Sequence, residues 1–71
     1  MIREGTEVEW DYSGNTATGK VKEVFHEKVS RTIDGSEITR DASDDEPAYL
    51  VEQEDGSQAL KSSSEVRRAD D

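Results

Sequence analysis

The sequence predicts a small all-β domain, a barrel of about five strands with a short helical turn before the last strand. The segment from Thr6 to Tyr12 alternates apolar and acidic residues, which is typical of a strand with one buried face. Two further short runs, Tyr49 to Gln53 and Ser57 to Lys61, flank the dipeptide Asp55-Gly56. An Asp-Gly pair between such runs favours a tight hairpin of the primed type, with positive φ at both residues.

The first expected strand has an apolar face formed by Val8, Trp10 and Tyr12, and its other face is acidic. Residues 13–16 are turn formers and end this strand. We therefore expect the chain to reverse there and to begin a second strand near Ala17.

The second expected strand runs from about Ala17 to Glu27. A glycine inside a strand, here Gly19, indicates a bulge or a close approach of another backbone. The alternation breaks where Val24 and Phe25 are adjacent, and a bulge or bend there would send one side chain to each side of a curled sheet. A helix from Lys20 to Arg31 is the competing interpretation, which Gly19 and the β-branched residues disfavour.

The middle of the chain has a weaker pattern. Residues 29–39 alternate around Asp34-Gly35 and form either a second tight hairpin or a long mobile excursion. Residues 41–46 have the composition of a charged loop, which Pro47 closes.

The last part of the chain follows the hairpin at Asp55-Gly56. Three serines and Glu65 indicate a short helical turn, with Ser62 or Ser63 as its cap, that leads Val66 back to the barrel. We expect one domain over residues 1–68 and a frayed tail over residues 69–71.

The core of this domain is thin. Hydrophobic residues make up 30% of the 71 positions, and the mean hydropathy is −1.01. A chain this short gains little net stability at about 25 cal/mol per Å² of buried apolar surface, so we expect a modestly stable fold. The candidate core residues are Ile2, Val8, Trp10, Val21, Val24, Phe25, Val29, Ile33, Ile38, Tyr49, Leu50, Val51, Ala59, Leu60 and Val66.

The chain is strongly acidic, with 18 Asp and Glu, 9 Lys and Arg, and a net charge of −9. Proteins that bind nucleic acid through its phosphates need a basic surface, so this composition disfavours DNA or RNA binding. The acidity is explained by solubility or, alternatively, by adaptation to high salt, which screens the self-repulsion of the chain.

The sequence contains no cysteine, which excludes disulfides and thiolate metal sites. No apolar run approaches the roughly 20 residues of a membrane-spanning helix. The first residues lack the apolar segment of a signal peptide. We therefore expect a soluble cytoplasmic protein that does not engage a membrane.

Several residues form an ordered series: a glycine before a Val-x-Trp strand, a Thr-Gly-Lys-Val strand, and a Tyr-Leu-Val-Glu strand after Asp45-Glu46-Pro47. In this order the chain resembles the Tudor-domain family of hypervirulence-associated proteins, small bacterial and fungal domains formerly classed as of unknown function. The resemblance implies an SH3-like or Tudor-like barrel and very little biochemistry, since the family is named for a phenotype. It covers most of the chain and is carried by Gly5, Val8, Trp10, Gly19, Val21, Tyr49, Leu50, Val51, Glu52, Ala59, Lys61 and Val66.

Tudor-type domains often bind methylated Lys or Arg in a cage of three or four aromatic rings, whose faces attract the cation. Of the four aromatic residues here, Phe25 is expected in the core and Trp10 faces it in part. This supply fits an aromatic-lined peptide groove better than a full cage, and core packing with ordinary surface rings is the alternative. The predicted ligand-binding residues are the rings of Trp10, Tyr12 and Tyr49 and the carboxylates of Glu9, Asp11 and Glu52.

No pattern indicates catalysis, a metal or a cofactor. His26 is the only histidine, and no nucleophile has a recognisable spacing to it. Residues 62–64 are serines without the surroundings of a nucleophile elbow. The acidic loop 41–46 lacks the ligand order of an EF-hand. The Gly14 to Lys20 spacing resembles a phosphate loop only superficially, because Val21 replaces the Ser or Thr.

The sequence thus favours a non-enzymatic binding module that recognises a peptide or protein surface, a basic one because the field of the domain is negative. We expect it to act as a monomer without a cofactor. Two alternatives stay open: a structural or stress-related protein that oligomerises through strand edges, and a nucleic-acid-associated SH3-like domain whose cations gather on one face.

Overall fold

The structure is a computed structural model that describes residues 2–69, and the fold of these residues is all-β, as predicted. It has seven strands rather than about five. In chain order the elements are β1 (Glu7–Tyr12), β2 (Asn15–Phe25), β3 (Val29–Ile33), β4 (Ser36–Arg40), β5 (Ala48–Glu52), β6 (Gln58–Ser62), the 3₁₀ turn η1 (Ser63–Glu65) and β7 (Arg67–Arg68).

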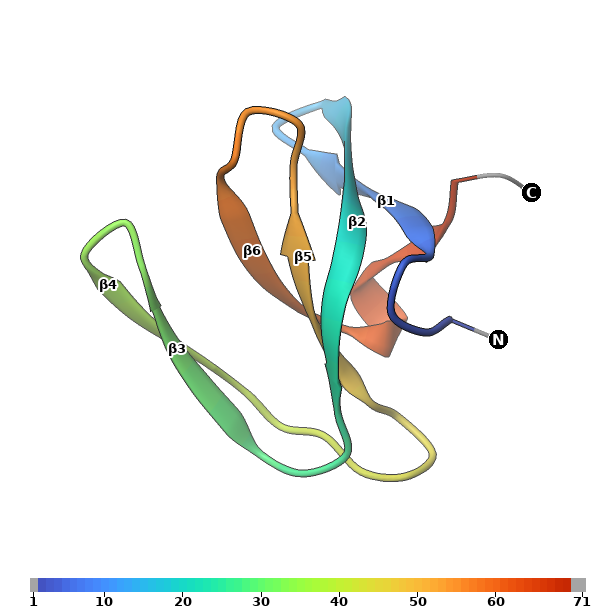
Figure 1. Ribbon diagram of the computed structural model, residues 1–71, viewed down its shortest axis with the longest axis vertical. Helices are drawn as coiled ribbons and strands as arrows, with labels where there is room; N and C mark the ends of the chain where they lie inside the picture. Colours follow the sequence, from blue (N-terminus) through green and yellow to red (C-terminus); the bar gives the residue numbers. More distant parts are fainter. Residues whose placement is uncertain (1, 70–71) are drawn as a thin grey trace.

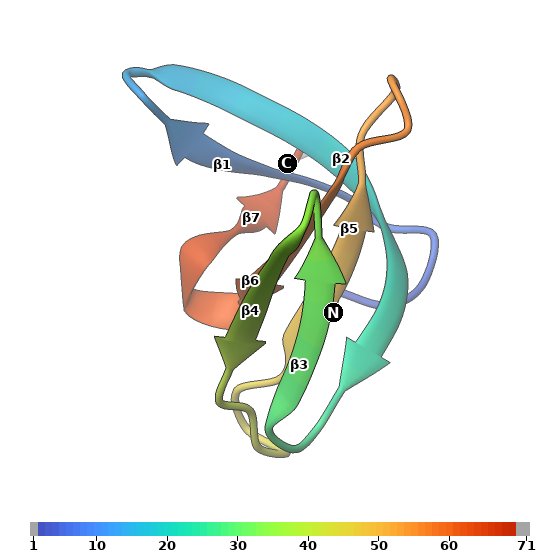
Figure 2. The same cartoon turned by 90° about the vertical axis from the view of Figure 1, so that its left-hand side faces the viewer.

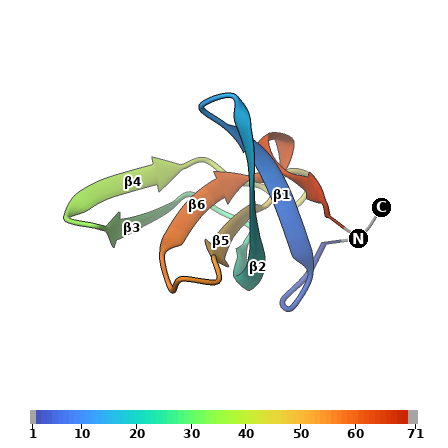
Figure 3. The ribbon, with the colours of Figure 1, turned by 90° about the horizontal axis from the view of Figure 1, so that it is seen from above.

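The strands form two antiparallel sheets (Figure 1). The larger sheet has the order β6-β5-β2-β1-β7, and the hairpin β3–β4 forms the second sheet alone. Turned by 90°, the hairpin lies in front of β5 and β6 (Figure 2), and from above it extends to one side of the larger sheet (Figure 3). Within residues 2–69 no strand ladder joins the two sheets, so they do not close into a barrel and the predicted SH3-like barrel is not confirmed.

The long strand β2 bends and belongs to both halves of the larger sheet. It pairs with β1 through its first half and with β5 through its second, and its register with β5 shifts between Val21 and Glu23. After the shift, Val24 packs on one side of the sheet and Phe25 on the other. The predicted bend is therefore confirmed, and the alternative helix is wrong.

Gly19 marks a close approach of β2 to β5, which is one of the two outcomes that the sequence predicted for this glycine. A Cβ atom at this position would lie 2.5 Å from Val51 Cγ1 and 2.9 Å from the carbonyl oxygen of Glu52. Only glycine therefore fits where these two backbones meet.

Two hairpins use the turn that Asp-Gly and Ser-Gly pairs favour. Asp34 and Gly35 have φ of 52° and 80°, and Ser13 and Gly14 have φ of 50° and 79°. Positive φ at both residues of a two-residue loop is the requirement of a type I′ turn. Residues 29–40 therefore form the tight hairpin, not the mobile excursion.

The hairpin β5–β6 has a different turn, and the prediction of a primed turn at Asp55-Gly56 is wrong. Only Gly56 has positive φ, 89°, while the Gln53 N–H donates to the Ser57 carbonyl over 2.8 Å. The Asp55 carboxylate accepts hydrogen bonds from the Ser57 hydroxyl (2.6 Å) and N–H (3.0 Å), which lower its pKa. These bonds favour a three-residue loop that ends in a left-handed glycine.

Strand β5 separates two hydrophobic clusters, and four of its five residues are buried. Cluster 1 lies on the inner side of the larger sheet and contains Val8, Trp10, Val21, Tyr49 and Val51. Cluster 2 lies beneath the hairpin β3–β4 and contains Val29, Ile33, Ala48, Leu50 and Leu60.

The C-terminal corner is fixed by Ser62 and Glu65. Ser62 is the N-cap of η1, as predicted, and its N–H and hydroxyl both donate to Glu65 Oε1 over 2.8 Å. The Ala69 N–H donates to the Glu7 carbonyl over 3.0 Å, so the predicted frayed tail does not include Ala69. Residues 70–71 of that tail lie outside the described residues. No helix among residues 2–69 is long and apolar enough to cross a membrane.

Candidate binding surface

Two depressions in the described surface have no lining residue in common. One, the β6 groove, has a volume of about 420 Å³ and runs along β6 between the β1–β2 end of the sheet and the hairpin β3–β4. The other, the Tyr49 pocket, has a volume of about 750 Å³ and lies where the N-terminal residues, the end of β2 and the start of β5 meet. Each contains some of the predicted ligand-binding residues.

The β6 groove contains two of the predicted rings. Trp10 and Tyr12 line it from β1, Ile33 and Ile38 from the hairpin, and Leu60 with its neighbours from β6. Tyr12 is 66% exposed and is the one large hydrophobic side chain in residues 2–69 that is exposed. Trp10 is only 3% exposed, and Lys61 Nζ lies 5.6 Å from its ring centroid. Tyr12 is thus the accessible ring and Trp10 the buried base.

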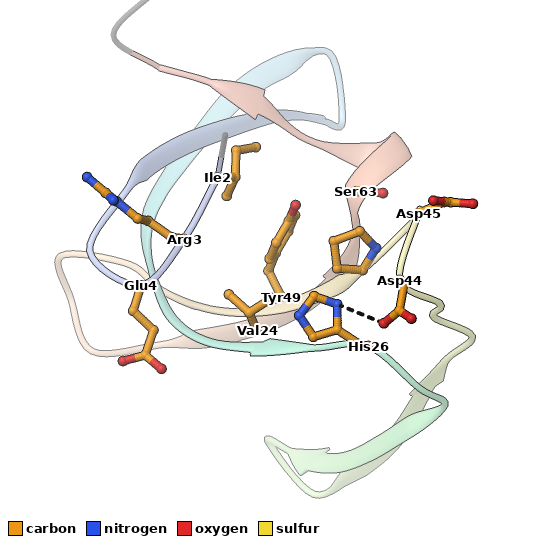
Figure 4. A pocket seen from close by; sticks show the side chains of 10 residues that line it. Ile2, Arg3, Glu4, Val24, His26, Asp44, Asp45, Tyr49 and Ser63 are labelled. Atoms are coloured by element: carbon orange, nitrogen blue, oxygen red, sulfur yellow. Dashed lines mark ion pairs between the residues drawn. The ribbon is translucent and has the colours of Figure 1, made fainter.

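The Tyr49 pocket contains the third predicted ring (Figure 4). Its walls combine apolar and charged side chains: Ile2, Arg3, Glu4, Val24, His26, Asp44, Asp45, Pro47, Tyr49 and Ser63. The Tyr49 side chain lies among them with its hydroxyl end between Ile2 and Ser63 in this view. Tyr49 is 4% exposed, and burial raises the pKa of its hydroxyl.

Local backbone contacts place the acidic side of this pocket. In the loop before β5, the Ser43 N–H donates to the Glu46 carbonyl over 3.0 Å, and the Glu46 N–H donates to Ser43 Oγ over 3.1 Å. This closed turn holds Asp44 and Asp45 at its tip. The Ser63 N–H donates to the Pro47 carbonyl over 2.8 Å, which joins η1 to the base of the same loop.

The predicted carboxylates lie outside both depressions. Arg67 Nη2 lies 2.9 Å from Glu9 Oε2 and 3.3 Å from Asp11 Oδ1. Lys22 Nζ lies 3.8 Å from Glu52 Oε1. Strand alternation puts Glu9 and Asp11 on the opposite face of β1 from Trp10, so the structure does not bring the six predicted residues together.

The four aromatic rings do not line one depression. Trp10 and Tyr12 line the β6 groove and Tyr49 lines the Tyr49 pocket. Phe25 packs against cluster 2, with the Arg31 guanidinium 4.7 Å from its ring centroid. The described residues therefore assemble no three-ring cage of the kind that binds a methylated cation.

The sequence reasoning missed much of both walls. It assigned no ligand-binding role to Ile33 and Ile38, nor to Ile2, Val24 and Pro47. The adjacent Val24-Phe25 pair was a usable signal, since it sends one apolar side chain away from the hairpin. Ile2 had no such signal, because its contacts depend on the path of the whole chain.

Residues 2–69 give little support for a metal site or for a catalytic role of His26. No group of three or more His, Asp or Glu side chains in this part of the chain could hold a metal ion. His26 Nδ1 lies 3.8 Å from Asp44 Oδ1, and both side chains are largely exposed. Exposed pairs of this kind contribute little to stability.

Comparison with known proteins identifies the family. No curated protein and no solved structure gave a match. A family model described as "Hypervirulence associated proteins TUDOR domain" matches residues 5–66, nearly the whole chain. Tudor-like domains are generally binding modules that recognise peptides or proteins. On this match, the chain belongs to the TUDOR-domain family of hypervirulence-associated proteins.

Proposed function

We propose that this domain is a non-enzymatic, SH3-like interaction module that binds an extended segment of another protein in the β6 groove. The observation that supports it most directly is Tyr12, which stands exposed at a groove whose base includes the buried ring of Trp10. Tyr and Trp side chains are enriched among the residues that contribute most binding energy at protein interfaces.

The backbone of β6 supports an extended ligand. β6 is an edge strand of the larger sheet, and within residues 2–69 no backbone hydrogen bond joins it to the hairpin. An edge strand leaves alternate N–H and carbonyl groups available to a peptide that adds as a further strand. The partly exposed side chain of Ile38 would then contact side chains of that peptide, above the buried Ile33 and Leu60.

The charge of the domain indicates basic flanks on the partner. The net charge of −9 attracts cationic segments over long range and raises their association rate. Asp11 and Glu52 lie outside the groove, where they would act on residues that flank the bound segment. Nucleic acid is a poorer partner, because Lys22, Arg31, Arg40 and Arg67 already pair with carboxylates of the chain.

Selection of peptides from a random library on the immobilised domain tests this proposal. We expect selected peptides with an apolar centre and Lys or Arg flanks, whose affinity falls about tenfold or more in Tyr12→Ala, because an interface ring of this kind contributes about 2 kcal/mol or more. Asp11→Lys combined with Glu52→Lys should lower the association rate and its salt dependence. Tyr49→Phe is the matched control outside the groove. Selected peptides that bind Tyr12→Ala and the charge-reversed variant unchanged would refute the proposal.

A second candidate function, self-association through the same edge, is favoured by the unpaired side of β6. Sedimentation velocity at increasing protein concentration separates the two functions. The interaction module stays monomeric, whereas edge-to-edge assembly gives a sedimentation coefficient that rises with concentration. In the second case Gln58→Lys, which places a charge at an exposed position of the edge strand, should restore the monomer, and Glu54→Lys in the adjoining loop should not.

A further inference from the structure

The hydroxyl of Tyr49 opens into the Tyr49 pocket and has no hydrogen-bond partner among residues 2–69. Tyr49 is 4% exposed, yet its hydroxyl takes part in none of the hydrogen bonds found among residues 2–69. No side-chain oxygen or nitrogen in these residues is both fully covered and unsatisfied, so the hydroxyl reaches the open space of the pocket. A recessed hydroxyl of this kind is a hydrogen-bonding group for something that enters from outside.

The mouth of the same pocket is acidic. Glu4, Asp44 and Asp45 line it, and Arg3 is the one Lys or Arg side chain among its described lining residues. Figure 4 shows Asp44 and Asp45 on one side of the opening and Glu4 on another, with the Tyr49 ring between them. A cationic group at this mouth would be attracted, and an anionic group would be repelled.

The walls between the hydroxyl and the mouth are apolar. Val24 comes from the bend of β2, Pro47 precedes β5, and Ile2 covers the N-terminal side. The pocket volume of about 750 Å³ falls in the range of small-molecule sites. Four chain segments line it: the N-terminal residues, the end of β2, the stretch that leads into β5, and η1.

We propose that the Tyr49 pocket is a second binding site, separate from the β6 groove, for a small aromatic ammonium compound with a hydrogen-bonding group on its ring. The ring packs against Val24 and Pro47. The ring substituent exchanges a hydrogen bond with the Tyr49 hydroxyl, and the ammonium group lies among the carboxylates of the mouth.

Titration of the ¹⁵N-labelled domain with three probes tests this site by NMR. Tyramine has both polar ends, phenethylamine lacks the ring hydroxyl, and 3-(4-hydroxyphenyl)propanoate replaces the ammonium with a carboxylate. We expect saturable shifts at the amides of Glu4, Val24 and Ser63 with tyramine, with a Kd of about 1 mM or tighter. Phenethylamine should bind more weakly, and the propanoate should cause no saturable shift.

Tyr49→Phe removes only the hydroxyl and keeps the ring. It should weaken the binding of tyramine about threefold to tenfold, which corresponds to the loss of one hydrogen bond. The binding of phenethylamine should be unchanged. Tyr12→Phe makes the same chemical change outside the pocket and should alter the binding of neither probe. If Tyr49→Phe lost the same affinity for both amines, the cause would be a change of packing, and the assigned hydrogen bond would be overturned.

Asp44→Asn combined with Asp45→Asn tests the mouth. This variant should weaken the binding of both amines about threefold at low salt. At high salt the variant and the original domain should bind the amines equally well. Asp41→Asn, a loss of charge in the same loop outside the pocket, is the matched control. Absence of a saturable shift with tyramine, or shifts confined to Tyr12 and Lys61, would overturn the proposal. Unchanged tyramine binding in Tyr12→Ala separates this site from the proposed peptide groove.

Discussion

The two sides of β5 are built differently. Cluster 1 is enclosed by strands that share backbone ladders, from β1 through β2 to β5 and β6. Cluster 2 is covered by the hairpin β3–β4, which has no ladder with the larger sheet in the described part of the chain. The exposures agree with this difference, since Val8 and Val51 are 0% exposed while Val29 and Ile33 are 7% and 8% exposed.

Among residues 2–69, the hairpin is held to the sheet by side-chain contacts alone. Besides cluster 2, its contacts are the Arg31 guanidinium over the Phe25 ring, the Arg31–Glu23 pair at 4.0 Å and the Arg40–Glu65 pair at 2.9 Å. Segments with few backbone hydrogen bonds to their surroundings open at lower free energy than the global unfolding. We therefore expect the hairpin to open alone, and this motion would widen the β6 groove that it lines.

The largest effect is expected on the cluster 1 side, in Gly19→Ala. The added Cβ would lie 2.5 Å from Val51 Cγ1 and 2.9 Å from the Glu52 carbonyl, and neither a buried β-branched side chain nor a paired backbone can move freely. We expect a loss of about 3 kcal/mol in the free energy of unfolding, measured by urea denaturation with far-UV circular dichroism.

Gly35→Ala in the hairpin turn is the control for this comparison. The new Cβ meets nothing within 4 Å, but φ of 80° is strained for alanine, so we expect a loss of about 1 kcal/mol. An equal loss in the two variants would contradict the tight contact between β2 and β5.

The second prediction concerns Ile33→Ala in cluster 2. A buried Ile→Ala change costs about 2–5 kcal/mol, and we expect the lower end because Ile33 is 8% exposed. The loss should appear mainly as opening of the hairpin. Native-state hydrogen exchange should show faster exchange over residues 29–40, while Val21 and Val51 keep most of their protection. Uniformly faster exchange across both sheets would show that hairpin and sheet unfold as one unit.

Sequence patterns predicted elements whose cause is local. Alternation predicted β1, and the glycine inside β2 predicted either a bulge or a close approach of another backbone, of which the structure shows the approach. The turn at Asp55-Gly56 shows the limit, because the dipeptide fits two loop geometries. Two features select the loop geometry that is observed: the hydrogen bonds from Ser57 to the Asp55 carboxylate, and the register of β5 with β6. The same dipeptide type at Asp34-Gly35 adopts the primed turn.

The candidate sites depend more on long-range structure. Of the three rings predicted to line one groove, Trp10 and Tyr49 share cluster 1, whereas Tyr12 is exposed. The bend of β2 and the separate hairpin then place Tyr49 and Tyr12 in different depressions. No local pattern reports a register shift between distant strands, so the separation of Tyr49 from Tyr12 was not predictable from the residues alone.

The third prediction uses acid to release the hairpin from η1. Burial raises the pKa of Glu65, but hydrogen bonds from Arg40 and Ser62 outweigh it and lower the pKa from 4.5 to about 2. Because the folded pKa is depressed, the stability from this group is present above about pH 4.5 and is lost as the pH falls toward 2. The side chain is 35% exposed, so solvent screening reduces the contribution to about 1 kcal/mol.

Glu65→Gln measures this contribution directly. The difference in unfolding free energy between the original chain and Glu65→Gln should be about 1 kcal/mol at pH 6 and close to zero near pH 2. Glu54→Gln, an exposed carboxylate on the β5–β6 loop, is the control and should show no such pH dependence. A difference that stays constant from pH 6 to pH 2 would contradict the role of the ionised Glu65.

The smallest effect is expected where the hairpin meets Phe25. The Arg31 guanidinium lies 4.7 Å from the ring centroid, and Arg31 Nη2 lies 4.0 Å from Glu23 Oε2. A partly exposed cation–π contact contributes about 0.5–1 kcal/mol, and Lys keeps the charge but not the flat stacking surface. Arg31→Lys should therefore lower the free energy of hairpin opening by about 0.5 kcal/mol, measured by hydrogen exchange over residues 29–40, and the loss should persist at high salt. If high salt abolished the difference, the Glu23 ion pair rather than the ring would be the contact that holds the hairpin.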